Sequence, residues 1–115
     1  MQRSIGIAMV LSLFFIFSGF TGFSKKTKTS FKVWGNCGMC KEKIEGAVNE
    51  VSGVVFCNWN EETKKMVVRF DNEKTSLKII KSVIAAAGYD TEEYRATNED
   101  YKSLHHCCQY ERPEN

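Results

Sequence analysis

The sequence predicts a small α+β domain in which a four-stranded antiparallel sheet carries two helices on one face. Two segments repeat apolar residues at helical spacing, and the shorter segments around them have the composition or alternation of strands. Their order along the chain is βαββαβ. Two right-handed split crossovers of this order place both helices on the same side of the sheet. The prediction is therefore a ferredoxin-like sandwich followed by a short C-terminal tail.

The first strand and the first helix flank a turn that contains two cysteines. Phe31 and Val33 alternate with more polar positions, as in a short strand. Five residues then recur at the spacing of one helical face: Cys40, Ile44, Ala47, Val48 and Val51. Gly53 ends this helix, because glycine readily adopts the left-handed conformation that follows helix C-termini. Cys40 thus begins the buried face, whereas Cys37 precedes it in the loop.

A hairpin of two strands follows the first helix. β-Branched and aromatic residues fill Val54–Trp59, and residues 60–63 form a polar turn. In the third strand Met66, Val68 and Phe70 alternate with outward-facing positions. This alternation predicts a sheet with only one buried face.

The second helix begins at Thr75 or Ser76, either of which can cap it. Its apolar face consists of Leu77, Ile80, Val83, Ile84 and Ala87. Gly88 closes the helix. Residues 90–96 have a weaker strand pattern and are predicted to form the fourth strand, and residues 98–104 are predicted to form a short helix before the tail.

Residues 1–24 have the pattern of a secretory signal peptide. Residues 5–17 are apolar and uncharged and follow Arg3, and the small residues Gly22 and Ser24 mark a plausible cleavage point. An uncleaved anchor is the alternative, because the apolar run is near the lower length limit for crossing a bilayer. We therefore expect an exported protein of the periplasm or cell envelope, in contact with a membrane only if this segment is uncleaved.

The charge balance and the cysteine spacing exclude two classes of protein. The chain has 16 Lys and Arg against 14 Asp and Glu, a formal net charge of +2, which gives no reason to expect nucleic-acid binding. The five cysteines do not form a disulfide framework, because Cys37 and Cys40 are too close to cross-link the fold and Cys107 and Cys108 are adjacent. Cys57 stands alone on the second strand and is predicted to pack in the core.

Cys37 and Cys40 form a Cys-x-x-Cys pair at the start of the first helix, and this pair is the main candidate site. The positive end of the helix dipole favours thiolates there. Two thiolates without a neighbouring carboxylate or imidazole suit a soft ion of low coordination number, Cu(I) first and Hg(II) second. A tetrahedral zinc site would need four ligands. An open two-thiolate site also lets a partner's thiol enter before either bond breaks, which favours a metal carrier over an enzyme.

Residues 29–96 resemble the heavy-metal-associated domain family, whose members include copper chaperones and the periplasmic mercury-binding protein. The resemblance rests on the Cys-x-x-Cys loop, the Ser52-Gly53-Val54 turn and the Ala87-Gly88-Tyr89 helix end. It implies that Cys37 and Cys40 bind the metal and that the residue after the helix-ending glycine packs near them. It also implies that the partner is a metal-transporting membrane protein or another thiol-rich metal carrier. Residues 97–115 lie outside the resemblance as a His- and Cys-containing tail.

The chain departs from the family just before the first cysteine. Members of the family usually have Gly-Met-Thr or Gly-Met-Asp there, and this chain has Trp34-Gly35-Asn36. The methionine that anchors the loop in the family is therefore absent. Members selective for zinc or cadmium tend to have a carboxylate where this chain has Asn36, and an amide cannot supply one.

The alternative function is that of a thiol–disulfide oxidoreductase using Cys37 and Cys40. The run that begins at Trp34 superficially resembles the Trp-Cys-Gly-Pro-Cys-Lys site of thioredoxins. Trp34 is, however, two residues too far from Cys37, and Pro113 is the only proline in the chain. The interpretation adopted is therefore metal binding, with no catalytic residue and no organic cofactor.

The tail contains a run of four potential metal ligands, His105, His106, Cys107 and Cys108. We predict that they form a separate, weaker metal site. An exposed tail whose neighbouring cysteines oxidise, and ligation shared with the loop, remain open as alternatives. Distance favours separation, because a fourth strand through residue 96 would end at the pole opposite the loop and the tail would have to return about 20–23 Å.

Overall fold

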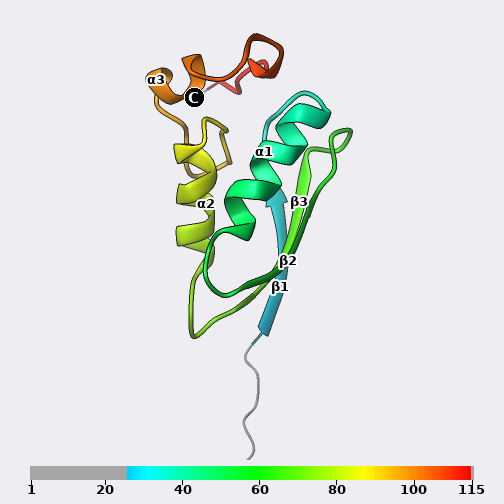
Figure 1. Ribbon diagram of the computed structural model, residues 1–115, viewed down its shortest axis with the longest axis vertical. Helices are drawn as coiled ribbons and strands as arrows, with labels where there is room; N and C mark the ends of the chain where they lie inside the picture. Colours follow the sequence, from blue (N-terminus) through cyan, green and yellow to red (C-terminus); the bar gives the residue numbers. More distant parts are fainter. Residues whose placement is uncertain (1–25, 115) are drawn as a thin grey trace, which may run out of the picture.

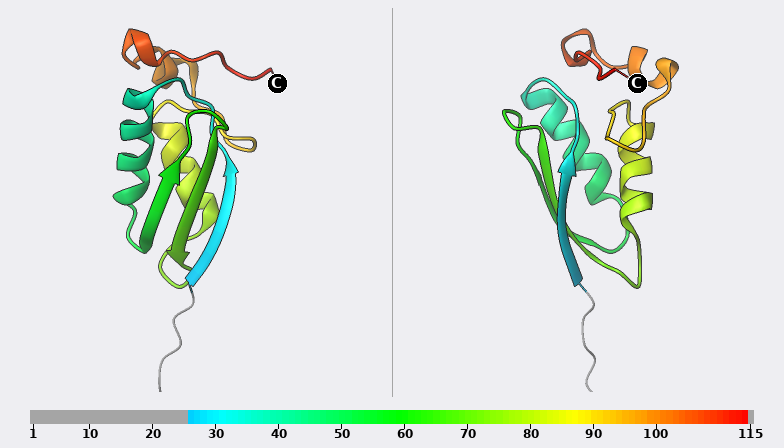
Figure 2. Two further views of the ribbon diagram at one scale, coloured as in Figure 1. Left: turned by 90° about the vertical axis from the view of Figure 1, so that its right-hand side faces the viewer. Right: turned by 180° about the vertical axis from the view of Figure 1, so that it is seen from behind.

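The computed structural model describes residues 26–114. Its elements are β1 (Lys26–Lys32), α1 (Gly38–Asn49), β2 (Val54–Trp59), β3 (Lys65–Asp71), α2 (Leu77–Ala86), α3 (Asn98–Lys102) and a 3₁₀ turn, η2 (His106–Cys108). The strands form an antiparallel sheet of order β1-β3-β2, and α1 and α2 cover one face of it (Figures 1 and 2). The signal peptide predicted over residues 1–24 lies outside the described residues.

The core lies between the sheet and the two helices, where the sequence periodicities predict it. β3 alternates buried and more exposed side chains along its length, with Met66 and Val68 fully buried. The helices contribute Ile44, Val48, Ile80 and Ile84, all of which are fully buried. Each such aliphatic side chain stabilises the fold by about 1.5–3 kcal/mol. Ser76 caps α2, since its Oγ accepts a hydrogen bond from the Ile79 N–H at 3.2 Å.

The prediction of a fourth strand over residues 90–96 is wrong for the described chain. Only an isolated bridge forms there, at Thr91. The chain then turns back, because the Thr91 N–H donates to the Tyr94 carbonyl at 2.8 Å and the Tyr94 N–H donates to Thr91 Oγ1 at 3.1 Å. The Ala96 N–H donates to the buried Asp90 carboxylate at 2.8 Å, which closes the turn. Local hydrogen bonds thus replace a strand ladder.

The turn keeps the tail at the pole of the molecule where β1 ends and α1 begins (Figures 1 and 2). The tail therefore has no sheet length to retrace, and the expected return of about 20–23 Å does not arise. α3 begins after Thr97, whose Oγ1 accepts from the Asp100 N–H at 3.0 Å. Within residues 26–114 no helix is long and apolar enough to cross a membrane.

Candidate metal centre

The Cys-x-x-Cys loop sets both of its cysteines at the N-terminal end of α1. Cys37 is the N-cap residue with an extended backbone, and its carbonyl accepts from the Lys41 N–H at 3.0 Å. Cys40 lies in the first turn and is fully buried, whereas Cys37 is half-buried. The predicted difference in exposure between the two thiols is confirmed.

Trp59 supports the loop from the core. Its ring is fully buried, and its indole N–H donates to the Val33 carbonyl at 3.0 Å. The loop backbone lies directly on the ring, because a Cβ built on Gly35 would come within 2.9 Å of a Trp59 ring atom. An aromatic side chain from β2 therefore fills the core beside a loop that lacks the family's methionine.

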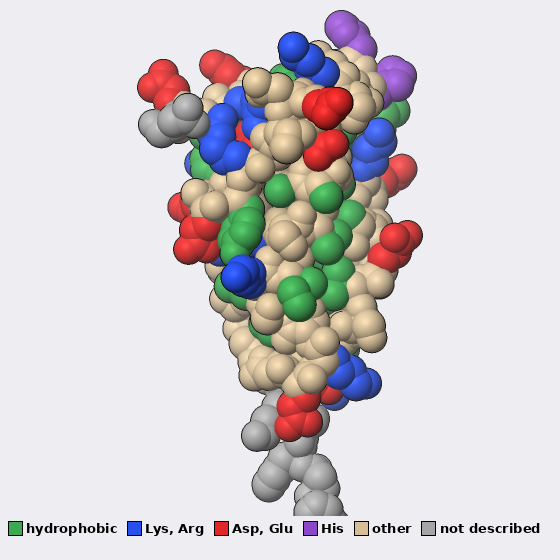
Figure 3. Space-filling model, turned by 90° about the vertical axis from the view of Figure 1, so that its left-hand side faces the viewer, with side chains coloured by type: hydrophobic (Ala, Val, Ile, Leu, Met, Phe, Trp, Pro, Cys, Tyr) green, Lys and Arg blue, Asp and Glu red, His purple; other side chains and the backbone are tan. Residues whose placement is uncertain are grey.

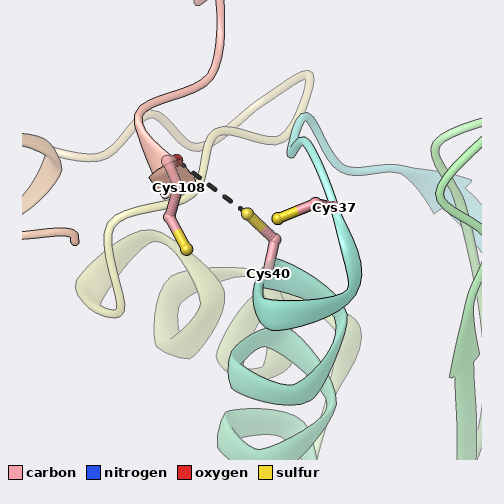
Figure 4. Close-up of side chains that lie close together, drawn as sticks. All are labelled: Cys37, Cys40 and Cys108. Atoms are coloured by element: carbon pink, nitrogen blue, oxygen red, sulfur yellow. Dashed lines mark hydrogen bonds between the residues drawn. The ribbon is translucent and has the colours of Figure 1, made fainter. Parts of the chain in front are cut away.

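Cys108 joins the two loop cysteines. The Sγ atoms of Cys37, Cys40 and Cys108 all lie within 4.8 Å of one another (Figure 4). In this view Cys108 comes from the tail and faces the two loop thiols from the opposite side. Cys108 is fully buried, and its carbonyl accepts a long S–H contact of 3.9 Å from Cys40. The cluster thus combines two residues predicted as ligands with one that was assigned to a separate tail site.

The remaining predicted tail ligands lie on the outer surface. Cys107 Sγ is 3.6 Å from His105 Nδ1 and 3.7 Å from the thioether sulfur of Met39, and all three side chains are exposed. Both histidines of the chain project from the tail end of the molecule (Figure 3). The structure therefore divides the four tail residues, with Cys108 among the loop thiols and His105, His106 and Cys107 outside. A separate site among these outer residues stays a prediction.

Tyr110 and Arg112, which the sequence analysis did not single out, hold the tail against the domain. The buried Tyr110 hydroxyl donates to the Gly88 carbonyl and accepts from the Asp90 N–H, both at 2.9 Å, and its ring stacks on Tyr89 with centroids 5.6 Å apart. Arg112 donates to both carboxylate oxygens of Asp90, at 2.8 and 2.7 Å. These contacts fix the segment that carries Cys108.

The sequence carries a signal for this docking, because Cys108 and Tyr110 alternate with the polar Gln109 and Glu111. Cys108 and Tyr110 are buried and Arg112 is half-buried, whereas residues 107, 109 and 111 are exposed. A period of two is typical of an extended segment with one inward face, which here follows the 3₁₀ turn η2. Asn36 adds a direct link from the loop, because its Nδ2 donates to the Cys107 carbonyl at 3.2 Å. The amide that replaces the family's Thr or Asp thus binds the tail.

The environment shifts the pKa values of the buried thiols in opposite directions. Burial opposes ionisation of Cys40, but the backbone at Cys37 and Asn36, with smaller contributions from Tyr89 and Cys108, brings its pKa below the ordinary value. Burial, and next the hydrogen bond with Cys40, raise the pKa of Cys108 to about 11. Cys40 is therefore the more readily ionised of these two thiols, and Cys108 is protonated at neutral pH.

Tyr89 completes the wall of the cluster. It is fully buried, and its hydroxyl has no hydrogen-bond partner among the described residues. Burial, followed by the neighbouring Cys40 and Cys108, raises its pKa well above the ordinary value. The residue that the family resemblance placed near the metal loop therefore brings a neutral hydroxyl to the thiols.

Comparisons with known proteins agree with this geometry. The model of the heavy-metal-associated domain matches residues 36–90. The copper chaperone CopZ of Staphylococcus aureus is 34% identical over 55 residues, which make up 48% of this chain and 81% of CopZ. The match to the family model ends at Asp90, so the tail and Cys108 lie beyond it.

Two solved structures show the same fold. The water-soluble region of the P-type ATPase CopA from Bacillus subtilis aligns with a TM-score of 0.57 and 27% identity, over 61% of this chain and 47% of that one. Oxidized MerP from Ralstonia metallidurans CH34 aligns with a TM-score of 0.50 and 28% identity, over 57% of this chain and 96% of that one. The expected ferredoxin-like arrangement is therefore shared, with three strands formed in the described chain.

Proposed function

Because this chain belongs to the heavy-metal-associated domain family, we propose that it binds a soft metal ion, most readily Cu(I), through Cys37 and Cys40. The observation that carries the proposal is the pair of thiols at the N-terminal end of α1, one buried and one half-exposed. Thiolate sulfur is the ligand that Cu(I) prefers in proteins. Hg(II) is the second candidate, because it is also soft and accepts few ligands.

The difference in exposure between the two thiols suits transfer of the metal. Cys40 holds the ion from the buried side, and Cys37 lies where the thiol of a docking protein can approach. The lowered pKa of Cys40 makes its thiolate easier to form than that of an ordinary cysteine. Metal then passes by exchange of one sulfur ligand for another, without release of a free ion.

The partner that we propose is a metal-transporting membrane protein or another thiol-rich metal carrier. Support comes from the similarity to CopZ, which is named a copper chaperone, and to the soluble region of CopA, which is named a P-type ATPase. Residues 1–24 support an exported location in the periplasm or cell envelope, through their signal-peptide pattern alone.

A thiol–disulfide oxidoreductase is the competing function. The relatives named as copper chaperones favour a carrier. An insulin-reduction assay with the wild-type protein separates the two functions. If the protein is a carrier, dithiothreitol reduces insulin no faster in its presence than alone. Catalytic turnover that requires Cys37 and Cys40 would favour the enzyme.

Anaerobic competition with a Cu(I) chelator tests the proposal. The Cys37→Ser and Cys40→Ser variants are expected to lose most of the affinity for the first copper equivalent. Cys57→Ser is the matched control, because this thiol lies on β2 beside Glu45 and Asn49, outside the cluster. A Cys37/Cys40 double serine variant that holds copper as tightly as the wild type would show that the site lies elsewhere. Native mass spectrometry after loading with Cu(I), Hg(II) or Zn(II) reports the metal preference.

A further inference from the structure

We propose that Cys108 is a third thiolate ligand of the metal bound at Cys37 and Cys40, so that the docked tail closes the loop into a three-sulfur site. This inference rests on the proposed function, because it requires metal at the loop. It adds a ligand from outside the part of the chain that matches the family model, which ends at residue 90.

The spacing of the three sulfur atoms fits trigonal coordination. With metal–sulfur bonds of about 2.3 Å, three ligands in a plane around one ion lie about 4 Å from one another. The Sγ atoms of Cys37, Cys40 and Cys108 already lie within 4.8 Å of one another. Small side-chain rotations therefore bring all three to one ion, and the backbone of the loop and tail can stay in place.

The tail delivers Cys108 through hydrogen bonds on both sides of it, and those of Tyr110 are buried. Tyr110, two residues further on, is fixed by two hydrogen bonds of 2.9 Å to the backbone at Gly88 and Asp90. Asn36 binds the carbonyl of the preceding residue, Cys107. Since both neighbours are anchored, Cys108 is held toward the loop rather than carried there by a mobile tail end.

Simple packing is the alternative reading of a buried cysteine, because free cysteines are often buried. The Tyr89 hydroxyl argues for ligation. It is fully buried without a hydrogen-bond partner among the described residues, an arrangement that ordinarily costs free energy. Metal-bound Cys40 and Cys108 would be thiolates, which are much better acceptors than thiols. The metal-loaded site thus gives the Tyr89 hydroxyl a partner beside it.

A third ligand also defines how the metal leaves. A partner's thiol loses its proton and forms a new sulfur–copper bond, the Cys108–copper bond breaks, and Cys108 takes up a proton. Copper stays Cu(I) throughout, and Cys37 and Cys40 hold it during the exchange. Cys108 therefore covers the ion from the tail side while no partner is present.

X-ray absorption spectroscopy of the Cu(I)-loaded protein counts the sulfur ligands directly. We expect three sulfurs in the wild type and two in Cys108→Ser, with at least about ten-fold weaker Cu(I) binding in the variant, the lower end of the effect of losing a group that supports a metal site. Cys107→Ser is the matched control, because this neighbouring thiol is exposed and outside the cluster, and it is expected to keep three sulfurs. Cys108→Ala is a second variant, because alanine removes the thiol without placing a hydroxyl group at this buried position.

Three outcomes would overturn the proposal. These are two sulfurs in the wild type, three sulfurs retained in both Cys108 variants, and a copper-bridged dimer on native mass spectrometry in which a second copy supplies the third thiol. Failure of the proposed function gives a different result, namely undiminished copper binding by the Cys37/Cys40 double serine variant. A wild type with one copper, two sulfurs and full dependence on Cys37 and Cys40 would refute the third ligand alone.

Discussion

The Arg112 guanidinium binds both carboxylate oxygens of Asp90, from Nε to Oδ2 at 2.8 Å and from Nη2 to Oδ1 at 2.7 Å. Asp90 is fully buried, and the Arg112 side chain is 16% exposed. Arg112 Nη2 also donates to the Ala96 carbonyl at 2.6 Å. The pair joins the segment that follows α2 to the end of the tail, and it therefore stabilises both the turn that replaces the fourth strand and the segment that carries Cys108.

Replacement of Arg112 by Gln is expected to destabilise the metal-free protein by about 3–5 kcal/mol, because it leaves the Asp90 carboxylate buried without its cation. Urea denaturation measures the change. Arg69→Gln is the control, since Arg69 is exposed on β3 and its replacement is expected to change stability by less than about 0.5 kcal/mol. Equal stability of the two variants would show that the Asp90 pair does not anchor the tail.

The same pair predicts a dependence of stability on pH. Burial alone would raise the pKa of Asp90, but hydrogen bonds from Arg112 and the Ala96 N–H, with the Arg112 charge, hold it below the ordinary value. A carboxyl with a lowered folded pKa contributes its full stability above its unfolded pKa of about 3.9, and that contribution is lost as the pH falls through the folded value. We expect the stability of the metal-free wild type to decrease below about pH 4.

Arg112→Gln isolates the part of this effect that is due to the guanidinium, because Asp90 then keeps the Ala96 N–H but loses the hydrogen bonds and the charge of Arg112. We compare the free energy of unfolding at about pH 5 and about pH 3, on either side of the unfolded Asp pKa of about 3.9. Its decrease between these two values is expected to be smaller in the variant than in the wild type. Urea titrations at both values provide the comparison. Parallel decreases in the two proteins would assign the acid sensitivity to other carboxylates.

The elements that the sequence predicts correctly are those fixed by local periodicity. Helical spacing identifies α1 and α2, alternation identifies β3, and the position of Cys40 at the start of an apolar face predicts its burial. The fourth strand and the path of the tail depend instead on Asp90 and Arg112, which meet across 22 positions of sequence. Periodicity alone does not show which distant charges pair, so the sequence places Cys108 with the other tail ligands and leaves ligation shared with the loop only as an alternative.

Gly88 lies at the end of α2, where residues 100 and 104 of the tail pack closely against it. Its φ is +106°, and an added Cβ would lie 2.9 Å from Leu104 Cδ2 and 3.0 Å from the Asp100 carbonyl. Gly88→Ala is therefore expected to lose more than about 1 kcal/mol through backbone strain and contact with α3. Gly46→Ala is the control, because nothing lies within 4 Å of its Cβ position in α1, and helix propensity favours alanine there by about 1 kcal/mol. Thermal unfolding in which both variants shift in the same direction would contradict this packing.

Cys57 lies on the helix-facing side of β2, half-buried, with its Sγ 3.7 Å from the Glu45 carbonyl and 3.5 Å from Asn49 Oδ1. Burial, and then the Glu45 charge, raise the pKa of this thiol to about 11. Cys57→Ala is expected to leave the metal stoichiometry unchanged and to cost about 1 kcal/mol of stability. Native mass spectrometry and urea denaturation check the two parts, and loss of a metal equivalent would show that Cys57 binds metal.

The outer group of His105, Cys107 and Met39 is expected to bind a second soft metal ion more weakly than the loop. Cys107 Sγ lies 3.6 Å from His105 Nδ1 and 3.7 Å from the Met39 thioether sulfur. A thiol, an imidazole and a thioether are ligands that suit Cu(I). The site is exposed and offers only one thiolate, so its affinity should be lower than that of the buried cluster. Titration of the wild type with Cu(I), followed by native mass spectrometry, is expected to show a second equivalent only at higher free copper.

Variants of the tail distinguish this second site from non-specific binding. Cys107→Ser and His105→Ala are expected to lose the second equivalent and to keep the first, because Cys37, Cys40 and Cys108 remain. His106→Ala is the matched control, because His106 is exposed and, among the described residues, the side-chain contacts of Cys107 are with His105 and Met39. A second equivalent that survives Cys107→Ser, or that disappears in His106→Ala as readily as in His105→Ala, would show that the outer group is not a defined site.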